Sequence, residues 1–474
     1  MAREVPDNLV ARVAELETLV ARLEAKLAAQ AKQMALKDGV LIDQIGRIAE
    51  LEKALEDAHR GSKRQTAPFS KGNPKAEPKT PGRKSGDKHG RHGHRRAPVG
   101  PPDRELDAPL PACCPDCGGD VVHERDDEQF QVDVPEVRPT VTRFSVGVGR
   151  CSKCKRRIQG RHAEQTSDAL GAAGSQIGPT LKGWAMWLHY RMGLSFGRTA
   201  EVLARLGVNV TAGAICQSSA HAASAELVPV HAELVRRANA SKTLTMDETG
   251  WRVGGRGKWL WVAANAELTL CWVGDGRGFA NATEVIAAGY AGVLVRDGYV
   301  IYRHYDKATH QSCLAHLVRR CREMEADLAR PDRKIPVAAK AILSDALAAR
   351  DLPGAERAAA AVDLAGRLDV LCARPTANDA NRRLLKHLAN EGPHLFTFLT
   401  VEGVDATNFQ GEQAVRPCAV NRKTFGGNRT WAGAGTHGVI TSIIATAAKH
   451  RLDAVDYLAA RARGPDLDLA VLLG

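Results

Sequence analysis

The chain has 474 residues, 44% of them hydrophobic, and a formal net charge of +12. This length suits about three or four domains, because one domain usually takes about 100 to 200 residues. The amino terminus lacks an apolar signal segment, and the most apolar run, at residues 438–448, is too short to span a bilayer. These features argue against a membrane protein and predict a cytoplasmic one.

The amino-terminal region, residues 1–59, is predicted to form a coiled coil. One heptad position is apolar seven times in succession, at Val13, Val20, Leu27, Met34, Leu41, Ile48 and Leu55. Such a repeat favours a partner helix that covers the apolar seam. We therefore expect a homo-oligomer, with packing of this helix on the rest of its own chain as the alternative.

Residues 60–111 are predicted to be a disordered basic linker. Residues 60–96 contain twelve Lys or Arg and two acidic residues, which gives this stretch a net charge of +10. Its polar composition cannot bury enough apolar surface to offset the entropy of ordering. A basic segment of this kind is typical of nucleic-acid binding, and a merely solvated linker is the alternative.

Residues 112–165 are predicted to form a zinc ribbon. Two CxxC pairs, separated by 33 residues, are formed by Cys114, Cys117, Cys151 and Cys154. Four thiolates suit one structural, tetrahedral Zn²⁺, whereas a reducing compartment disfavours disulfides. Strand-like runs at residues 130–134 and 141–148 predict a hairpin between the pairs. Redox-active or coincidentally spaced cysteines are the alternative.

Residues 166–240 are predicted to be helical and similar to a helix-turn-helix. A helix, a turn at Gly207 and a second helix that begins after Thr211 have the required spacing. The spacing fits DNA binding, but pairs of short helices are also common as ordinary packing units.

The period of the apolar pattern changes to two within residues 241–325. Runs that start at Leu244, Lys258 and Leu268 are separated by turn sequences and predict antiparallel strands. A helical stretch at residues 281–289 and a buried-type strand at residues 292–297 follow. Together they predict the first part of a multidomain α/β protein with a ribonuclease H-like core.

The second part of this core is predicted at residues 401–474. Between Asp297 and Glu412 lie 114 residues, far more than a strand crossover requires. Alanine-rich stretches fill this interval and predict a helical insertion at residues 326–400. Glu412 would then belong to a helix that returns to the core after the insertion.

Three acidic residues are the candidates for catalysis. Asp247 and Asp297 are expected at the carboxyl ends of strands, where α/β sheets place their sites, and Glu412 on a helix. Three converging carboxylates could hold two Mg²⁺ ions and cut nucleic acid. On the residues alone, this pattern fits any metal-dependent nuclease.

Motifs along nearly the whole chain resemble transposases of the insertion sequence 66 family. They include DETGWRV, WLWV, DGY, CLAHLVRR, EQAVRP and RK. The resemblance implies a DDE triad of Asp247, Asp297 and Glu412, and it favours Asp247 over Glu248. It also implies two catalytic Mg²⁺ ions, for which Mn²⁺ can substitute.

The family implies a DNA transposase associated with the bacterial nucleoid. Its partners would be double-stranded DNA, both the terminal inverted repeats and the target, with small accessory proteins as further partners. Hydrolysis would free a 3′-hydroxyl, which the same metals would direct to target DNA. A catalytically weak regulator that only binds DNA is the first alternative, and a ribonuclease of the same fold is the second.

Several basic residues near the acidic motifs could bind phosphates, with solvated surface charge as the alternative. They are Arg416, Arg422, Lys423, Arg319 and Arg320. Cys313 and His316 form a CxxH motif, which has the spacing of a metal-binding knuckle. We prefer a packing or hydrogen-bonding role for these two residues, with metal binding as the alternative. The family usually has two asparagines and an alanine before the glutamate. Here the residue before Glu412 is Gly411, which predicts that Glu412 lies near a helix start.

Overall fold

The computed structural model describes residue 12, residues 15–28 and 30, residues 100–174 and residues 176–464. The chain divides into two compact units, Met1–Pro81 and Gly82–Gly474. In the first unit, the described residues are helical, as the heptad repeat predicts. The rest of the predicted coiled coil and residues 60–99 of the predicted linker lie outside the described residues.

The region around the two CxxC pairs contains one small antiparallel sheet. Its strands, β1 (Val148–Arg150) and β2 (Arg157–Gln159), flank the second pair of cysteines. The predicted strand at residues 130–134 is wrong, and the run at residues 141–148 reaches strand geometry only at its last residue. Phe130 is 45% exposed and Val134 77% exposed, so these apolar residues have no packed surface that would stabilise a strand.

A helical region follows, and its two central helices match the sequence prediction. Its segments are η1 (Gly171–Gly174), α3 (Pro179–Met186), η2 (Trp187–Arg191), α4 (Phe196–Arg205), α5 (Ala212–His221), η3 (Ala222–Glu226) and α6 (Val228–Ala240). Gly207 turns the chain with a φ of 81°, in the left-handed region that glycine adopts without strain. The Thr211 hydroxyl then caps α5 by accepting a hydrogen bond from the Ala214 amide, at 3.1 Å.

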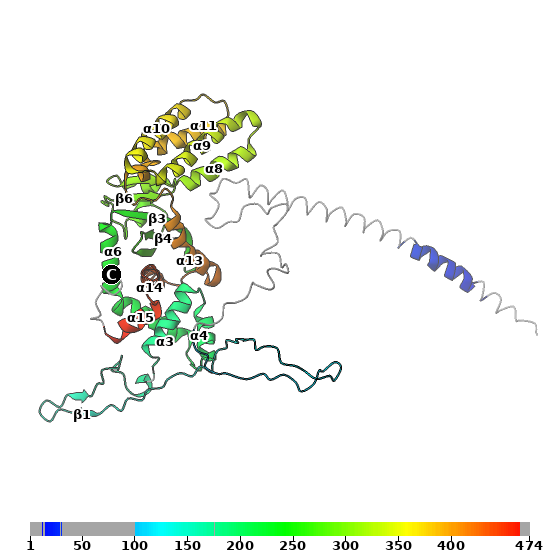
Figure 1. Ribbon diagram of the computed structural model, residues 1–474, viewed down its shortest axis with the longest axis vertical. Coiled ribbons are helices and arrows are strands. Elements are labelled where there is room, and N and C mark those ends of the chain that lie inside the picture. The colour runs from blue at the N-terminus through cyan, green and yellow to red at the C-terminus, as the bar shows by residue number, and fades with distance from the viewer. Residues whose placement is uncertain (1–11, 13–14, 29, 31–99, 175, 465–474) are drawn as a thin grey trace, which may run out of the picture. The chain divides into compact units, whose positions relative to one another are not determined.

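The central sheet has five strands in the order β5-β4-β3-β6-β7. Figure 1 labels β3, β4 and β6 of this sheet. The five strands are β3 (Thr243–Val253), β4 (Arg256–Ala264), β5 (Thr269–Gly274), β6 (Val293–Arg296) and β7 (Thr309–Ser312). The first three strands pair antiparallel, whereas β6 is parallel to β3 and β7 is parallel to β6. This mixed α/β sheet is consistent with the predicted ribonuclease H-like core.

The connections between these strands differ in part from the prediction. The expected helix at residues 281–289 is replaced by a single turn, α7 (Phe279–Ala282), followed by irregular chain. A further turn, η4 (Val300–His304), connects β6 to β7. The apolar side chains of the irregular stretch still pack in the core, with Ile286 fully buried.

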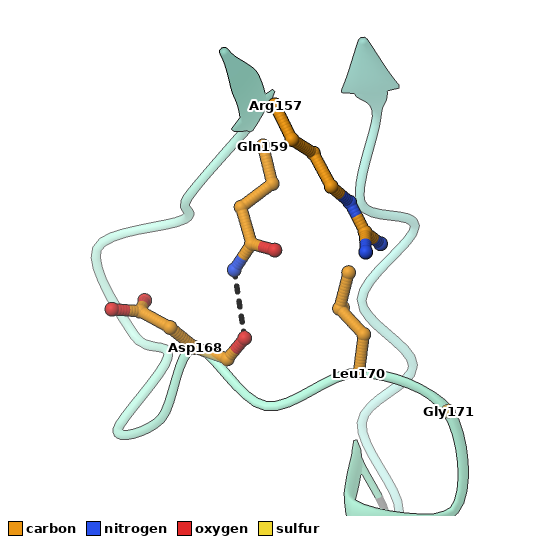
Figure 2. A pocket seen from close by; sticks show the side chains of 5 residues that line it. All are labelled: Arg157, Gln159, Asp168, Leu170 and Gly171. Atoms are coloured by element: carbon orange, nitrogen blue, oxygen red, sulfur yellow. Dashed lines mark hydrogen bonds between the residues drawn. The ribbon is translucent and has the colours of Figure 1, made fainter. Parts of the chain in front are cut away.

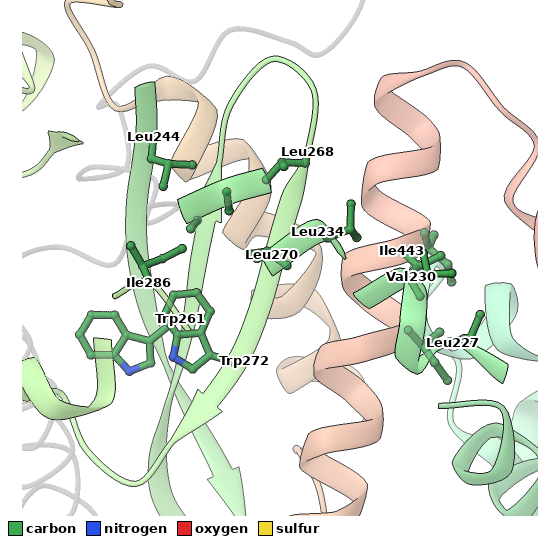
Figure 3. Close-up of a cluster of buried hydrophobic side chains, with 14 of the residues drawn as sticks. Leu227, Val230, Leu234, Leu244, Trp261, Leu268, Leu270, Trp272, Ile286 and Ile443 are labelled. Carbon is green, nitrogen blue, oxygen red and sulfur yellow. The ribbon is translucent and has the colours of Figure 1, made fainter. Parts of the chain in front are cut away.

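One hydrophobic core fixes the sheet to the helices around it (Figure 3). It combines Leu244 of β3, Trp261 of β4 and Trp272 of β5 with Leu234 of α6 and Ile443 of α14 (Trp431–Lys449). The rings of Trp261 and Trp272 are stacked with their centroids 6.2 Å apart. Burial of such large aromatic surfaces supplies much of the stability of a core.

The long segment between β7 and Glu412 is helical, as predicted. Its helices are α8 (Leu314–Asp327), η5 (Arg330–Arg333), α9 (Lys334–Ala348), η6 (Ala349–Asp351), α10 (Gly354–Cys372), α11 (Asp379–Glu391), η7 (Gly392–His394) and α12 (Thr397–Thr400). Most of these helices share a second hydrophobic core with Val293 and Val295 of β6. Figure 1 shows α8, α9, α10 and α11 grouped next to β6.

Three helices complete the fold: α13 (Phe409–Phe425), α14 and α15 (Ala454–Arg463). Helix α14 covers the edge strand β5 with small side chains spaced four residues apart. Ser442 accepts a hydrogen bond from the Cys271 amide at 2.8 Å, and Thr446 accepts one from the Thr269 amide at 3.1 Å. The helix thus satisfies edge amides that would otherwise be open to pairing with another chain.

Candidate active site

The parallel pairing of β3 with β6 brings two candidate aspartates to the same level. Thr245 lies opposite Val295 in the register. Asp247 comes two residues after Thr245, and Asp297 comes two residues after Val295. The two aspartates are therefore expected on the same face of the sheet. Asp297 directly follows β6, as predicted, but Asp247 lies within β3 because this strand continues past β6 to pair with β4.

Glu412 is in the first turn of α13, as the preceding glycine predicts. A Cβ atom on Gly411 would lie 3.0 Å from Thr245 Cγ2 and 2.5 Å from Asn408 Oδ1. Glycine therefore lets the start of α13 approach β3 more closely than alanine would. This close approach gives a physical reason for the departure from the usual family sequence.

The acidic residues form an electrostatically strained group. Asp247 and Asp297 are each only 7% exposed, and the Glu412 side chain is 20% exposed. Burial raises the pKa of Asp247 well above its usual range, and the charges of Glu248, Asp297 and Glu412 raise it further. A cation among these carboxylates would offset both burial and repulsion.

Glu248 has a different environment from its neighbour Asp247. It accepts hydrogen bonds from Arg277 Nε at 2.8 Å and from the Tyr302 hydroxyl. The guanidinium carbon of Arg277 lies 3.8 Å from the ring centroid of Tyr299. Since adjacent residues in a strand point to opposite faces, Glu248 is turned away from the face that α13 covers. These partners hold Glu248 in place, and the choice of Asp247 rather than Glu248 as the catalytic acid stays a prediction.

The donor chemistry of the acidic group fits magnesium, because carboxylate oxygens are the ligands that Mg²⁺ prefers. The backbone amide of Tyr299 donates to Asp297 Oδ1 at 2.9 Å, and the Glu248 amide donates to Asp247 Oδ1 at 2.9 Å. Each aspartate thus has one oxygen fixed by the backbone. In this structure, however, the side chains of the described residues, the three acids included, form no group of three or more His, Cys, Asp or Glu arranged to hold a metal ion, so magnesium binding stays a prediction.

The CxxH motif lies beside this group. His316 Nε2 is 3.5 Å from Glu412 Oε1, and its buried Nδ1 has no hydrogen-bond partner among the described residues. Cys313 Sγ accepts a hydrogen bond from the Asn408 amide at 3.2 Å. Burial raises the pKa of Cys313 to about 11, so the thiol is protonated at neutral pH. These contacts agree with the preferred packing and hydrogen-bonding role.

The predicted phosphate-binding residues differ in their surroundings. Arg319, Arg416 and Lys423 are exposed, and Arg416 and Lys423 lie on the helix that carries Glu412. Arg320 is half-buried, and burial lowers its pKa. All four remain predictions as DNA contacts.

Arg422, the fifth of them, is turned toward the protein. Its Nη1 donates to the carbonyl oxygen of Gly250 and, at 3.3 Å, to Thr249 Oγ1. These bonds join α13 to β3 just beyond Asp247.

Both CxxC pairs form tight backbone turns. The Cys114 amide donates to Gly119 at 2.8 Å, and the Cys151 amide donates to Arg156 at 2.9 Å. Backbone hydrogen bonds, first from Asp116 and from Cys154 respectively, lower the pKa of Cys114 and of Cys151. A lowered pKa favours the thiolate form that binds zinc. The predicted zinc site remains an expectation.

The chain after the second CxxC pair folds back on β2 (Figure 2). Gln159 Nε2 donates to the carbonyl oxygen of Asp168 at 2.7 Å, and Arg157 and Leu170 line the same hollow. Arg157 is exposed and belongs to the basic run that follows Cys154.

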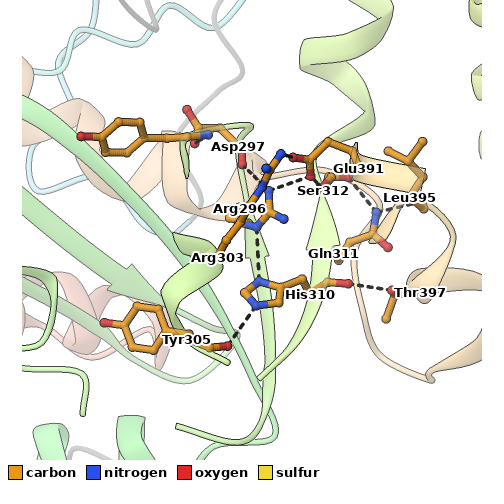
Figure 4. Close-up of polar contacts among 11 residues, drawn as sticks. Arg296, Asp297, Arg303, Tyr305, His310, Gln311, Ser312, Glu391, Leu395 and Thr397 are labelled. Carbon is orange, nitrogen blue, oxygen red and sulfur yellow. Dashed lines mark hydrogen bonds and ion pairs between the residues drawn. The ribbon is translucent and has the colours of Figure 1, made fainter. Parts of the chain in front are cut away.

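A buried ionic network next to Asp297 was not predicted from the sequence (Figure 4). Arg296 and Glu391 are both fully buried, and Arg296 Nη1 lies 2.8 Å from Glu391 Oε2. The same nitrogen donates to the Asp297 carbonyl at 3.0 Å. Glu391 also accepts hydrogen bonds from Arg303 and Ser312. The last residue of α11, in the insertion, thereby holds the strand end that carries Asp297.

Two signals in the sequence mark this network, although neither identifies the partner. An arginine is the last residue of the apolar strand at residues 293–296, and an acidic residue ends the apolar face of α11. Burial alone would raise the pKa of Glu391, but the charge of Arg296 and the hydrogen bonds from Ser312 and Arg303 lower it to about 2.

Comparison with known proteins assigns the family. The profile described as transposase IS66 family matches residues 174–436, more than half of the 474-residue chain, and this range includes Asp247, Asp297 and Glu412. No curated protein matches the chain. None of the described helices is long and apolar enough to cross a membrane. The chain belongs to the transposase IS66 family.

Proposed function

We propose that this transposase binds the inverted repeats of its element, cuts the DNA to free 3′-hydroxyls and joins them to target DNA. The observation that carries the proposal is the placement of Asp247 and Asp297 at one level of adjacent parallel strands. Helix α13 brings Glu412 to the same part of the sheet. Burial and the charges of Glu248, Asp297 and Glu412 raise the pKa of Asp247, and a bound cation would offset this.

The three carboxylates would act as ligands of two magnesium ions. Magnesium, when bound, would activate a water or a 3′-hydroxyl and stabilise the leaving oxygen at phosphorus. The protein would contribute positioning: the Tyr299 amide orients Asp297, and the contact of Gly411 with β3 orients Glu412. Because the nucleophile comes from water or DNA, no covalent intermediate with the protein is required.

The remaining parts of the chain would organise the DNA complex. The exposed side chains of Arg319, Arg416 and Lys423 would contact phosphates close to the cut, and residues 60–96 would add sequence-independent affinity. The amino-terminal helix would join protomers. Leu16 and Leu23 occupy the second apolar position of the heptad repeat, three residues after Val13 and Val20, and would lie in the seam between two such helices.

The four CxxC thiolates would hold one structural zinc ion and stiffen the region before the helical domain. Metal analysis of the purified full chain should find one zinc per chain. Retention of zinc after Cys151→Ser and Cys154→Ser together would contradict this assignment.

The direct test of the proposed function is Asp297→Asn, which keeps the size of the side chain and removes its charge. Cutting of the element's own ends and joining to target DNA should be lost, while binding to those ends persists. Asp275→Asn, at a residue whose side chain is 75% exposed, is the matched control and should remain active. Full joining activity of Asp297→Asn with magnesium would contradict the proposal.

The same assay separates the regulator alternative. If the wild-type protein binds the element's ends but does not cut them with magnesium or manganese, the chain acts as a DNA-binding regulator. Cutting of an RNA–DNA hybrid in preference to duplex DNA would instead favour a ribonuclease.

A further inference from the structure

The start of α13 places a polar side chain in the core and an apolar one at the surface. Asn408 is fully buried, whereas Phe409, the first residue of α13, is 58% exposed. No other Phe, Tyr or Trp that the structure describes is exposed to this extent. Asparagine is usually exposed and phenylalanine usually buried, so the two residues reverse the ordinary preference. Such a reversal is informative in a way that a single exposed apolar residue is not.

The chain next to Phe409 is fixed, so the point at which its side chain leaves the helix is defined. The Asn408 amide donates to Cys313 Sγ at 3.2 Å, and Asn408 Nδ2 donates to the Met246 carbonyl oxygen at 3.3 Å. The Asn408 carbonyl oxygen accepts a hydrogen bond from the Glu412 amide at 3.0 Å. These contacts hold Asn408 in the core, and the side chain that follows it, Phe409, remains at the surface.

Phe409 lies beside the candidate catalytic glutamate. Residues three apart in a helix have their Cβ atoms about 5 to 6 Å apart, and Glu412 is three residues after Phe409. Helical side chains lean toward the amino-terminal end, so the Glu412 side chain lies over the turn that begins with Phe409. A nucleotide whose phosphate lies at the acidic group would therefore have its base within reach of the Phe409 ring.

Phe409 also begins a continuous exposed face of α13. Four further exposed residues follow it at alternating intervals of four and three: Gln413, Arg416, Val420 and Lys423. Residues with this spacing share one face of a helix. Glu412 is the only acidic residue of α13. The face therefore has an aromatic ring beside the acidic group and cations further along, which matches the bases and the phosphates of a nucleic-acid strand.

An aromatic ring can stack on a base only where one face of that base is open. Inside a duplex, neighbouring base pairs cover both faces of each base. A base that has lost its pairing partner can instead turn outward and expose a face. Unpairing costs free energy, and stacking on an aromatic side chain offsets a comparable part of that cost. The chemistry of the Phe409 ring therefore favours an unpaired base over an intact base pair.

We propose that Phe409 stacks on an unpaired DNA base, that of the nucleotide next to the phosphate that is cut. The ring holds the DNA open at this point and positions the phosphate at the acidic group. This inference rests on the proposed function for the location of the cut, but not for the preference for an unpaired base. It adds a base contact to the phosphate contacts proposed for Arg416 and Lys423.

Binding of the full chain to random-sequence DNA tests the contact, because stacking on an aromatic ring accepts any base. Two duplexes of equal length carry the same phosphates, and the last base pairs of one duplex are mismatched. Wild type should bind the mismatched duplex about 5- to 150-fold more tightly, the range for one base stacked on a ring. F409A should lose this preference, and F409W, which keeps an aromatic ring, should retain it. W431A is the matched control, since Trp431 is 48% exposed and begins helix α14, and it should also retain the preference.

A wild-type preference in F409A, or an equal loss in F409W or in W431A, would overturn the proposal. The position of the contact is tested on the element's end with mismatches around the cut and one abasic nucleotide at a time. Wild type should lose affinity when the nucleotide next to the cut lacks its base, whereas F409A should be insensitive there. Equal sensitivity of both proteins at that position would also overturn it.

Failure of the proposed function gives a different result. If wild type does not cut the element's end, the transposition proposal fails, whereas the comparison of the two random-sequence duplexes still decides whether Phe409 stacks on an unpaired base.

Discussion

Single residues explain why the acidic group is held in place. Gly411 allows α13 to approach Thr245, and the Arg296 guanidinium holds the Asp297 carbonyl. Gly411 stands out in the sequence as a departure from the family pattern, but only the short distance between α13 and β3 explains why glycine is needed there. Arg296 belongs to an apolar strand, and its partner Glu391 lies nearly a hundred residues later in the chain.

The sequence predicted the three candidate acids but not the residues that position them. Asp247, Asp297 and Glu412 occur in recognisable local motifs, so their identity could be read from the chain. His316, Arg303 and Ser312 reach the same region through contacts between distant segments. Sequence spacing carries no information on such contacts, and for Arg422 it could not show that the side chain binds the backbone of β3.

Glu391→Gln is predicted to destabilise the protein strongly. Without this carboxylate, Arg296 and Arg303 would lose their shared anion at a buried site, which typically costs about 3 to 5 kcal/mol. Urea unfolding measures the free-energy change. The exposed pair of Arg367 with Asp345 provides the control, because Arg367→Ala should cost at most about 1 kcal/mol. A cost for Glu391→Gln no larger than this control would contradict the role of the network.

The same carboxylate predicts the direction of a pH effect. The folded pKa of Glu391 is lowered to about 2 from its usual 4.5, so its stabilising contribution is present above pH 4.5. This contribution should be lost as the pH falls from 4.5 toward 2. The stability difference between wild type and Glu391→Gln should therefore shrink over that range. A constant difference would show that the charge of Glu391 is not responsible.

At the scale of elements, the apolar pattern of period two predicted β3, β4 and β5, and a continuous apolar run predicted β6, because one or both faces of these strands are buried. The pattern of period two failed at residues 130–134, where the same alternation occurs without a surface to pack against. The helix expected at residues 281–289 shortened to one turn, since its apolar residues can also pack from irregular chain. Periodicity thus predicts elements well only where tertiary packing supports them.

The contact between α14 and the edge of β5 predicts opposite effects for two glycines of one helix. A Cβ on Gly438 would lie 2.8 Å from the backbone oxygen of Cys271, so Gly438→Ala should destabilise the protein by about 1 to 3 kcal/mol. Gly435 is exposed, with nothing within 4 Å of the added carbon, so Gly435→Ala should stabilise by about 1 kcal/mol. Chemical denaturation measures both. Equal effects would contradict the close packing of α14 on β5.

At the scale of the whole molecule, the family assignment covers residues 174–436, and the coiled coil, basic linker and zinc ribbon before it stay predictions from the sequence. The helical insertion is attached to the core at two levels, through the apolar contacts of β6 and through Glu391. The long interval between Asp297 and Glu412 was enough to predict the insertion. The contact that attaches the insertion beside Asp297 could be seen only in the structure.

The amino-terminal helix predicts an oligomer that depends on its apolar seam. Leu16→Glu with Leu23→Glu should dissociate the protein, because charges in the seam oppose pairing of helices. Leu19→Glu is the matched control, since Leu19 is 53% exposed and lies outside the seam. Light scattering after size-exclusion chromatography measures the mass. An unchanged oligomer in the double variant, or dissociation in the control, would contradict the assignment of the seam.

The central claim, that the acidic group binds the metal ions of a DNA-cutting centre, is tested most directly by Asp297→Cys. Magnesium prefers oxygen ligands, whereas manganese accepts a thiolate more readily. Substitution of a residue that only supports a metal ligand typically lowers activity by about 10- to 100-fold. Asp297 is the proposed ligand itself, so with magnesium the rate of cutting of the element's end should fall by more than that. With manganese, a substantial part of the activity should return. Wild-type cutting by Asp297→Cys in magnesium would contradict the account.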